Sequence, residues 1–249
     1  MLKIIMHGCN GRMGQTIVNL IREDENKIIV AGVSADGQAL NSFPVYKNIL
    51  ECKENADVII DFSNTSTLND LLSYATSHNT PLVIATTGFS DEELNKIKEA
   101  SKTIPILRSA NMSLGINLML DLIKKATSTL EKDFDIEIIE KHHNNKVDAP
   151  SGTALLLADT INDTLNEKAN YKYDRHIEKQ KRTKNEIGIH AIRGGTIVGE
   201  HSVIFAGDDE VIEITHTASS RKIFAKGALH AVDFIVEQKT GLFSMQDSL

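Results

Sequence analysis

Several residue types are scarce in this 249-residue sequence, and each shortage excludes a class of protein. There is no tryptophan and only 5% of residues are aromatic, so the chain lacks the stacking platforms of proteins that bind single-stranded nucleic acid. The formal net charge of -7 argues against a duplex or an anionic membrane, because both require a large positively charged face. We therefore expect no nucleic-acid partner, and we expect any anion to be bound by a local group of donors.

Cysteines and long apolar runs are also scarce. The two cysteines, Cys9 and Cys52, cannot form a disulfide framework. No apolar run approaches the roughly 20 residues that span a bilayer, and the N-terminus lacks the charged and apolar regions of a signal peptide. With 41% hydrophobic residues, the chain can bury a sizeable core and is not disordered. We expect a soluble, cytoplasmic protein without a membrane partner.

Strand and helix patterns alternate along the first 110 or so residues. Short apolar runs at 2–6, 27–33, 57–62, 82–85 and 104–107 are typical of buried strands. Apolar residues at helical spacing lie between them, and Ser90 with Glu93 forms a capping box ahead of one expected helix. This alternation predicts a Rossmann-like, doubly wound parallel sheet.

The pattern changes after Asn111. We expect a long helix at about 113–131, strands at 135–140, 187–193, 196–205 and 210–217, and a final helix at about 220–237. Turns at 194–195 and 207–209 predict hairpins between the last three strands, and the polar segment 162–186 predicts a mobile loop. The predicted fold class is α/β, with the Rossmann-like sheet followed by a smaller α+β domain whose sheet is mostly antiparallel or mixed.

A glycine-rich turn joins the first expected strand to the first expected helix. It reads Gly8-Cys9-Asn10-Gly11-Arg12-Met13-Gly14, and such glycines allow the backbone to approach a pyrophosphate at a helix N-terminus. A plain glycine-rich turn is the alternative. Ser34 stands where an acid would favour the unphosphorylated cofactor, whereas Asp36 could reach the ribose. The sequence thus predicts NADH or NADPH and leaves the choice between them open.

The most informative stretch is 140–154, which begins where a strand is expected to end and stops where a helix is expected to begin. Its histidines and lysine can hold a negative charge and deliver a proton near neutral pH; they are His142, His143 and Lys146. Hydroxyl and backbone donors to a carboxylate follow; they are Ser151, Gly152 and Thr153. A paired-histidine metal site is the alternative, but no third ligand is clearly placed and the lysine would repel a cation. No metal is therefore predicted.

Two further segments lie at the expected carboxyl ends of parallel strands, where ligands bind in this architecture. They are Thr86-Thr87-Gly88-Phe89 and Ser109-Ala110-Asn111-Met112, and ordinary turns are the alternative for both. Weaker candidates in the second region could equally be surface or interface residues; they are Arg193, Glu200, His201, His216 and Arg221.

These motifs resemble the 4-hydroxy-tetrahydrodipicolinate reductase (dihydrodipicolinate reductase) family over nearly the whole chain. The most specific part is E-x-H-H-x-x-K-x-D-A-P-S-G-T-A at 140–154, supported by the glycine-rich turn and by 86–89, 198–201 and 213–216. Three departures affect the cofactor pocket. Ala85 replaces a glycine before the two threonines, Met112 replaces an aromatic residue, and the family's acid-arginine pair after the second strand is missing.

The resemblance implies an NAD(P)H-dependent oxidoreductase of diaminopimelate and lysine biosynthesis, which reduces 4-hydroxy-tetrahydrodipicolinate to tetrahydrodipicolinate with loss of water. It implies His142 as the proton donor, Lys146 as its catalytic partner, and His143, Gly152 and Thr153 as ligands of the carboxylates of a small dicarboxylate heterocycle. The motifs and the resemblance together assign the dinucleotide to one set of residues: Gly8, Cys9, Asn10, Gly11, Arg12, Met13, Ser34, Asp36, Ala85, Thr86, Thr87, Ser109, Ala110, Asn111 and Met112.

The resemblance also implies a domain organisation. A discontinuous dinucleotide-binding domain would comprise residues 1–111 and 219–249, and a substrate-binding and oligomerisation domain would comprise residues 112–218. The sheet of the second domain would assemble a homotetramer, and domain closure would bring His142 to the nicotinamide. Two alternatives stay open, namely a reductase of this architecture acting on another imine or carbonyl, and a non-catalytic dinucleotide sensor.

Overall fold

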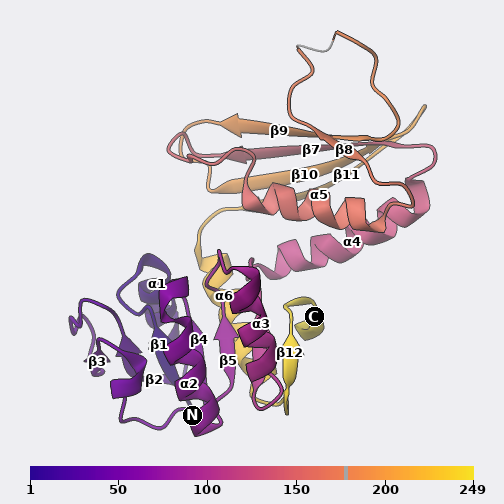
Figure 1. The fold of residues 1–249 in the computed structure, drawn as a ribbon. Helices are drawn as coiled ribbons and strands as arrows, with labels where there is room; N and C mark the ends of the chain where they lie inside the picture. Colours follow the sequence, from indigo (N-terminus) through magenta and orange to yellow (C-terminus); the bar gives the residue numbers. More distant parts are fainter. Residues whose placement is uncertain (177–178) are drawn as a thin grey trace. The chain divides into compact units, whose positions relative to one another are not determined.

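The computed structural model describes residues 1–176 and 179–249, which form two compact units. Unit 1 comprises Met1–Leu114 and Arg221–Leu249, and unit 2 comprises Gly115–Ser220. In Figure 1 the indigo and purple N-terminal segment and the yellow C-terminal segment belong to unit 1. Unit 1 is therefore discontinuous in sequence, and unit 2 is a single continuous segment.

Unit 1 is built on a seven-stranded sheet with the order β12-β6-β5-β4-β1-β2-β3, in which all pairs are parallel. Its strands are β1 (Leu2–His7), β2 (Lys27–Val33), β3 (Val45–Tyr46), β4 (Val58–Asp61), β5 (Leu82–Ile84), β6 (Pro105–Arg108) and β12 (Gly241–Phe243). The predicted doubly wound parallel sheet is confirmed. The sequence pattern does not predict β3 and β12, which are edge strands of two and three residues.

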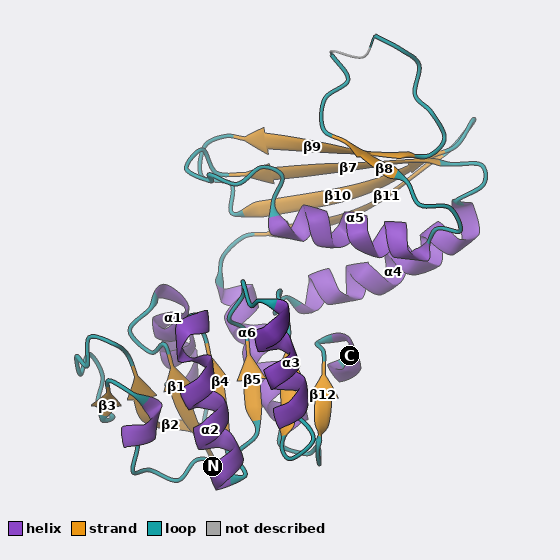
Figure 2. Ribbon diagram, in the orientation of Figure 1, coloured by secondary structure: helices purple, strands orange, loops and turns teal. Residues whose placement is uncertain are grey.

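Helices cover both faces of this sheet (Figure 2). They are α1 (Arg12–Ile21), α2 (Leu68–His78), α3 (Asp91–Ala100) and α6 (Lys222–Ile235), with short 3-10 turns at Ile49–Glu51, Thr65–Thr67 and Gln246–Ser248. Alternate residues of each strand point to opposite faces. One face packs against α1 and α6 and the other against α2 and α3, so each face has its own apolar core. The predicted capping box of Ser90 and Glu93 is present at the start of α3.

Unit 2 contains a five-stranded mixed sheet with the order β11-β10-β7-β9-β8. Its strands are β7 (Asp135–His142), β8 (Asn170–Lys172), β9 (Glu186–Arg193), β10 (Gly199–Ala206) and β11 (Val211–Ala218). The pairs β7-β10 and β10-β11 are antiparallel, whereas β7-β9 and β8-β9 are parallel. Two helices, α4 (Leu114–Leu130) and α5 (Gly152–Thr164), pack on one face of the sheet (Figure 2).

Two expectations for unit 2 are wrong. Residues 194–195 do not close a hairpin, because β7 lies between β9 and β10 and pairs with both. The segment 162–186 is not one loop, because α5 extends to Thr164 and β8 forms at 170–172; residues 177 and 178 lie outside the described residues. The hairpin at 207–209 is confirmed, since β10 and β11 are antiparallel neighbours.

None of the helices in residues 1–176 and 179–249 is both long enough and apolar enough to cross a bilayer.

Candidate active site

The glycine-rich turn of unit 1 lies between the end of β1 and the start of α1. Gly8 has a φ of +86°, and a Cβ at this position would lie 2.4 Å from Phe62 O. A Cβ at Gly14 would lie 2.2 Å from Gly8 O. Glycine is therefore required at position 8, where the turn approaches the backbone after β4, and at position 14, where α1 approaches the turn. Gly11 is the N-cap of α1 and provides no side-chain cap. The start of α1 is thus suited to receive a phosphate.

Asp36 is held beside this turn. Asn10 Nδ2 donates hydrogen bonds to Asp36 Oδ1 (2.7 Å) and to Gln38 O (2.9 Å). Hydrogen bonds from the Gln38 N-H, the Ser34 hydroxyl and the Asn10 amide lower the pKa of Asp36. The structure therefore brings together an ionised carboxylate and the predicted residues Asn10 and Ser34, next to the proposed phosphate turn.

Cys9 is a buried residue of the same turn. Burial, and then the charge of Asp36, raise the pKa of the Cys9 thiol to about 11. The thiol is therefore protonated at neutral pH and is not an activated nucleophile. Its packing in the apolar core against α1 indicates a space-filling role.

A cavity of about 420 Å³ lies at the carboxyl ends of β4 and β5 in unit 1. It is lined by Phe62, Ser63, Asn64, Thr65, Ala85, Thr86, Thr87 and Gly88. Thr86 is 6% exposed, and its Oγ1 has no hydrogen-bond partner among the described residues, which suits a hydroxyl that binds a ligand. The sequence pattern does not assign residues 62–65 to a site, although they follow β4 as 85–88 follow β5.

The predicted segment 109–112 follows β6. Ser109 Oγ donates to Asn111 O (2.8 Å) and accepts from Asn111 N-H (3.2 Å), so the segment is held by its own hydrogen bonds. Met112 is 2% exposed and belongs to the core against α1 and α6. Its assignment to the dinucleotide stays a prediction, as do those of Ser109, Ala110 and Asn111.

In unit 2 the informative stretch forms the end of β7, a loop and the first turn of α5. His142 is the last residue of β7 rather than a loop residue, so the sheet fixes its backbone. Glu140 and His142 lie on the same buried face of β7, because residues two apart point to one side of a strand. Ser151 is the N-cap of α5, and its hydroxyl accepts a hydrogen bond from Ala154 N-H (3.2 Å).

Glu140 is fully buried and connects the side chains of this cluster. His142 Nδ1 (2.6 Å) and Arg193 Nη1 (2.7 Å) donate to Oε2, while Arg193 Nη2 (2.7 Å) and Ser151 N-H (3.0 Å) donate to Oε1. Burial raises the pKa of Glu140, but the hydrogen bonds from Arg193, His142 and Ser151 together outweigh it and leave the pKa lowered. Glu140 is therefore a carboxylate that accepts the Nδ1 hydrogen of His142.

His201 of β10 completes the cluster. Its Nε2 lies 2.9 Å from Ser151 Oγ, and its ring is edge-on to that of His142, with 5.1 Å between the centroids. Burial, and then the neighbouring His142, lower the pKa of His201 to about 4. His201 is thus neutral at pH 7, beside the predicted proton donor.

The other predicted residues of unit 2 lie in the loop and the first turn of α5. Lys146 Nζ is 2.8 Å from Asp148 Oδ1, and this hydrogen bond lowers the pKa of Asp148. His143 Nδ1 is buried and has no hydrogen-bond partner among the described residues. Gly152 and Thr153 are the first two residues of α5, where a helix can receive a carboxylate. Their roles in binding and catalysis stay predictions.

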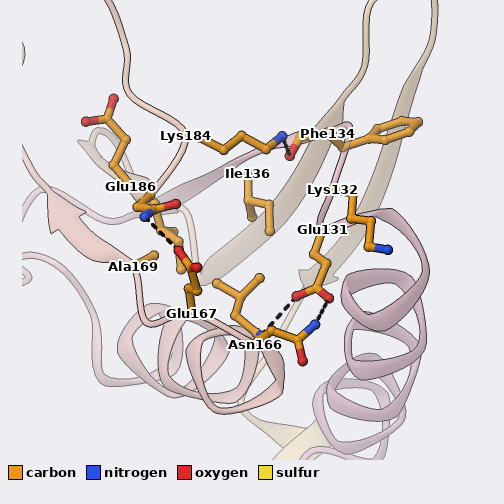
Figure 3. A pocket seen from close by; sticks show the side chains of 12 residues that line it. Glu131, Lys132, Phe134, Ile136, Asn166, Glu167, Ala169, Lys184 and Glu186 are labelled. Carbon is orange, nitrogen blue, oxygen red and sulfur yellow. Dashed lines mark hydrogen bonds between the residues drawn. The ribbon is translucent and has the colours of Figure 1, made fainter.

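A second cavity, of about 260 Å³, lies at the opposite end of β7 in unit 2 (Figure 3). Its polar groups bond to one another: Lys184 Nζ donates to Phe134 O (2.9 Å), and Asn185 Nδ2 donates to Glu167 Oε2 (3.3 Å). It contains none of the predicted site residues. No group of three or more His, Cys, Asp or Glu residues suited to a metal ion occurs in the described part of the chain.

The parallel sheet with its glycine-rich turn, and the histidine-carboxylate cluster of the second unit, are those of an NAD(P)H-dependent oxidoreductase. Two family descriptions match the chain, namely "Dihydrodipicolinate reductase, N-terminus" over residues 2–112 and "Dihydrodipicolinate reductase, C-terminus" over residues 115–249. The chain belongs to the dihydrodipicolinate reductase family. This confirms the resemblance and the enzyme class predicted from the sequence, together with the use of NADH or NADPH.

Individual relatives agree with this assignment. The chain is 55% identical over 247 residues to the 4-hydroxy-tetrahydrodipicolinate reductase of Caldanaerobacter subterraneus, which covers 99% of this chain and 98% of the relative. It is 55% identical over 245 residues to that of Clostridium tetani, with coverage of 98% and 96%. A solved structure, the dipicolinate-bound dihydrodipicolinate reductase of Paenisporosarcina sp. TG-14, is similar over 100% of both chains, with a TM-score of 0.84 and 25% identity.

Proposed function

We propose that the protein reduces 4-hydroxy-tetrahydrodipicolinate to tetrahydrodipicolinate with loss of water, in diaminopimelate and lysine biosynthesis. The observation that carries this proposal is the 55% identity, over 99% of the chain, to a 4-hydroxy-tetrahydrodipicolinate reductase. The dipicolinate bound to the Paenisporosarcina enzyme supports a small dicarboxylate ring as the substrate.

NADH or NADPH would bind at the carboxyl edge of the unit 1 sheet. The tight turn that Gly8 and Gly14 allow at the start of α1, and the Thr86 hydroxyl, which has no hydrogen-bond partner among the described residues, fit a dinucleotide there. The bound nicotinamide supplies the hydride. We assign the remaining contacts as the sequence predicts. The turn from Cys9 to Met13 would contact the dinucleotide, and Ser34 and Asp36 would lie near its adenosine ribose. Ala85, Thr87 and residues 109–112 would contact it farther along the edge of the sheet.

The substrate would bind in unit 2. His142 donates a proton from Nε2, because its Nδ1 is engaged by Glu140. His143, Gly152 and Thr153 bind the two carboxylates. This is supported by His143 Nδ1, which has no hydrogen-bond partner in the described part of the chain, and by the position of Gly152 and Thr153 at a helix N-terminus. Lys146 adds positive charge and a second donor.

The two units would then have different roles in binding. We propose that the discontinuous unit binds the dinucleotide and that the continuous unit binds the substrate and joins the subunits of a cytoplasmic homotetramer. The parallel sheet with its glycine-rich turn supports the first role. The second is supported by the sheet of unit 2, since α4 and α5 pack on one of its faces and the opposite face, where Arg175 and Arg182 contact Glu137, also carries the exposed side chain of Ile192.

Oxidation of the reduced nicotinamide tests the proposed function. Substrate is generated in place from pyruvate and aspartate semialdehyde by the preceding synthase, and NADH and NADPH are compared by their loss of near-ultraviolet absorbance. We expect rapid oxidation that depends on the synthase. A folded protein that binds a reduced cofactor but does not oxidise it in this assay would overturn the proposal and favour a sensor or another substrate.

A further inference from the structure

The proposed function uses His142 but leaves unexplained the buried carboxylate and guanidinium behind it. We propose that Glu140 and Arg193 are positioning residues, which keep the hydrogen of His142 on Nδ1 and so leave Nε2 as the nitrogen that exchanges a proton with the substrate. This inference rests on the proposed role of His142 as proton donor.

The hydrogen bonds of Glu140 exclude a direct role for this carboxylate in catalysis. Each of its two oxygens accepts two hydrogen bonds, and its side chain is fully buried. A carboxylate has about four lone-pair positions, so none is left for water or substrate. Glu140 can therefore affect the reaction only through the groups that donate to it, and one of these is His142.

Arg193 holds Glu140 in the orientation that His142 requires. It lies on β9 beside His142 of β7 in the parallel register, and its two terminal nitrogens contact the two oxygens of Glu140 separately. The same nitrogens donate to Ile192 O (2.8 Å) and Asp148 O (2.7 Å). This planar, two-point contact fixes the plane of the carboxylate, which the single ammonium group of a lysine cannot do.

The other nitrogen of His142 faces a different environment. A Cβ at Gly199 of β10 would lie 3.1 Å from His142 Nε2, so this glycine leaves space beside Nε2 that any other residue would fill. The neighbouring His201 ring adds no second positive charge, because burial holds its pKa at about 4. One side of the imidazole is thus bound to a fixed carboxylate, while the other side is bordered by a residue without a side chain.

The position of the hydrogen can be measured without turnover. Long-range proton-nitrogen NMR spectra of the full-length protein with labelled histidine, at an alkaline pH where imidazole is neutral, distinguish the two tautomers. We expect wild-type His142 to carry its hydrogen on Nδ1, and we expect Glu140→Gln to shift a substantial fraction to Nε2. Wild-type His142 with its hydrogen on Nε2 would overturn the inference.

Kinetics provide the second measurement. Glu140→Gln is expected to lower kcat by about 100-fold, as loss of an orienting carboxylate does elsewhere, with less than about a twofold change in KM for the cofactor. The matched control is Glu99→Gln, which breaks an exposed ion pair with Lys102 at the end of α3 and is expected to preserve both kcat and the tautomer. An unchanged kcat in folded Glu140→Gln would overturn the inference.

A second variant covers the case in which Glu140→Gln does not fold. Arg193→Lys retains the positive charge but loses the two-point contact, and we expect the same shift in tautomer with a smaller loss of kcat. An unaltered tautomer and kcat in this variant would overturn the role of Arg193. The two proposals fail separately: wild-type protein with the expected tautomer but no substrate-dependent oxidation would overturn the proposed function alone.

Discussion

His201 allows a quantitative prediction of how stability depends on pH. The residue is 5% exposed, and its pKa is lowered from 6.5 to about 4 by burial and by His142. In the unfolded chain a histidine titrates near its ordinary value of about 6.5. Between these two pH values the unfolded state binds more protons than the folded state, so the free energy of unfolding decreases as the pH is lowered.

The magnitude follows from the difference between the two pKa values. It corresponds to about 3 kcal/mol lost in total below pH 4, of which about 2 kcal/mol is lost between pH 7 and pH 5. Urea unfolding followed by circular dichroism at pH 7, 6 and 5, at one protein concentration, measures this loss. We expect His201→Gln to be less stable than wild type at pH 7, and its deficit to shrink by about 2 kcal/mol at pH 5.

The control is His176→Gln, which removes an exposed histidine of the same unit and is expected to follow the wild-type pH dependence. Wild-type and His201→Gln curves that stay parallel from pH 7 to pH 5 would refute the reasoning that burial keeps His201 neutral.

Three further predictions concern catalysis and cofactor binding. His142→Ala is expected to lower kcat by about 100-fold or more with little change in the cofactor Kd, measured by fluorescence titration; equal losses in both would contradict its role as proton donor. Lys146→Ala is expected to lower kcat or raise the substrate KM with an unchanged circular dichroism spectrum, and wild-type kinetics would remove it from the site. Gly14→Ala would place a Cβ 2.2 Å from Gly8 O, so we expect a lower Tm and a cofactor Kd raised by about tenfold or more; unchanged cofactor binding would refute the assignment of this turn.

The main elements of both units could be predicted because their hydrophobic patterns are local. The pattern at 27–33 predicts a strand with the bounds that β2 has, and the five predicted strands of unit 1 are rich in apolar residues, as expected for a sheet covered on both faces. The strands that were missed, β3, β8 and β12, are two or three residues long. β5 is equally short, but its three residues are apolar and buried, whereas β3, β8 and β12 are partly exposed edge strands, so no buried run marks them in the sequence.

Strand pairing in unit 2 could not be predicted for a different reason. The glycines at 194–195 mark a turn, but the chemistry of a turn does not determine which strands become neighbours. The sheet places β7, from much earlier in the chain, between β9 and β10. Strand order depends on packing across the whole unit, which a local pattern does not contain.

The residues of the candidate site are likewise predictable only where they are close together in the sequence. The motif at 140–154 is contiguous, so His142, Lys146 and Thr153 could be selected from the sequence alone. Arg193 and His201 were only weak candidates, because their contacts with Glu140 and Ser151 join residues about 50 positions apart. These contacts arise from the strand register of the sheet, which the spacing of residues in the sequence does not predict.

The unit whose synthesis begins first is the last that can be completed. Residues 1–114 leave the ribosome early, but α6, which supplies Ala225, Ala228, Val232 and Ile235 to one core of unit 1, leaves after all of residues 115–220. At about 5–20 residues per second, translation of that segment takes on the order of 5–20 s. During this interval the continuous unit can fold, while the earlier strands present an apolar surface without the helix that later covers it. The nascent chain is therefore most exposed to aggregation and to chaperone binding at an intermediate length, after strands β1 to β6 have been synthesised and before α6 and β12 join them.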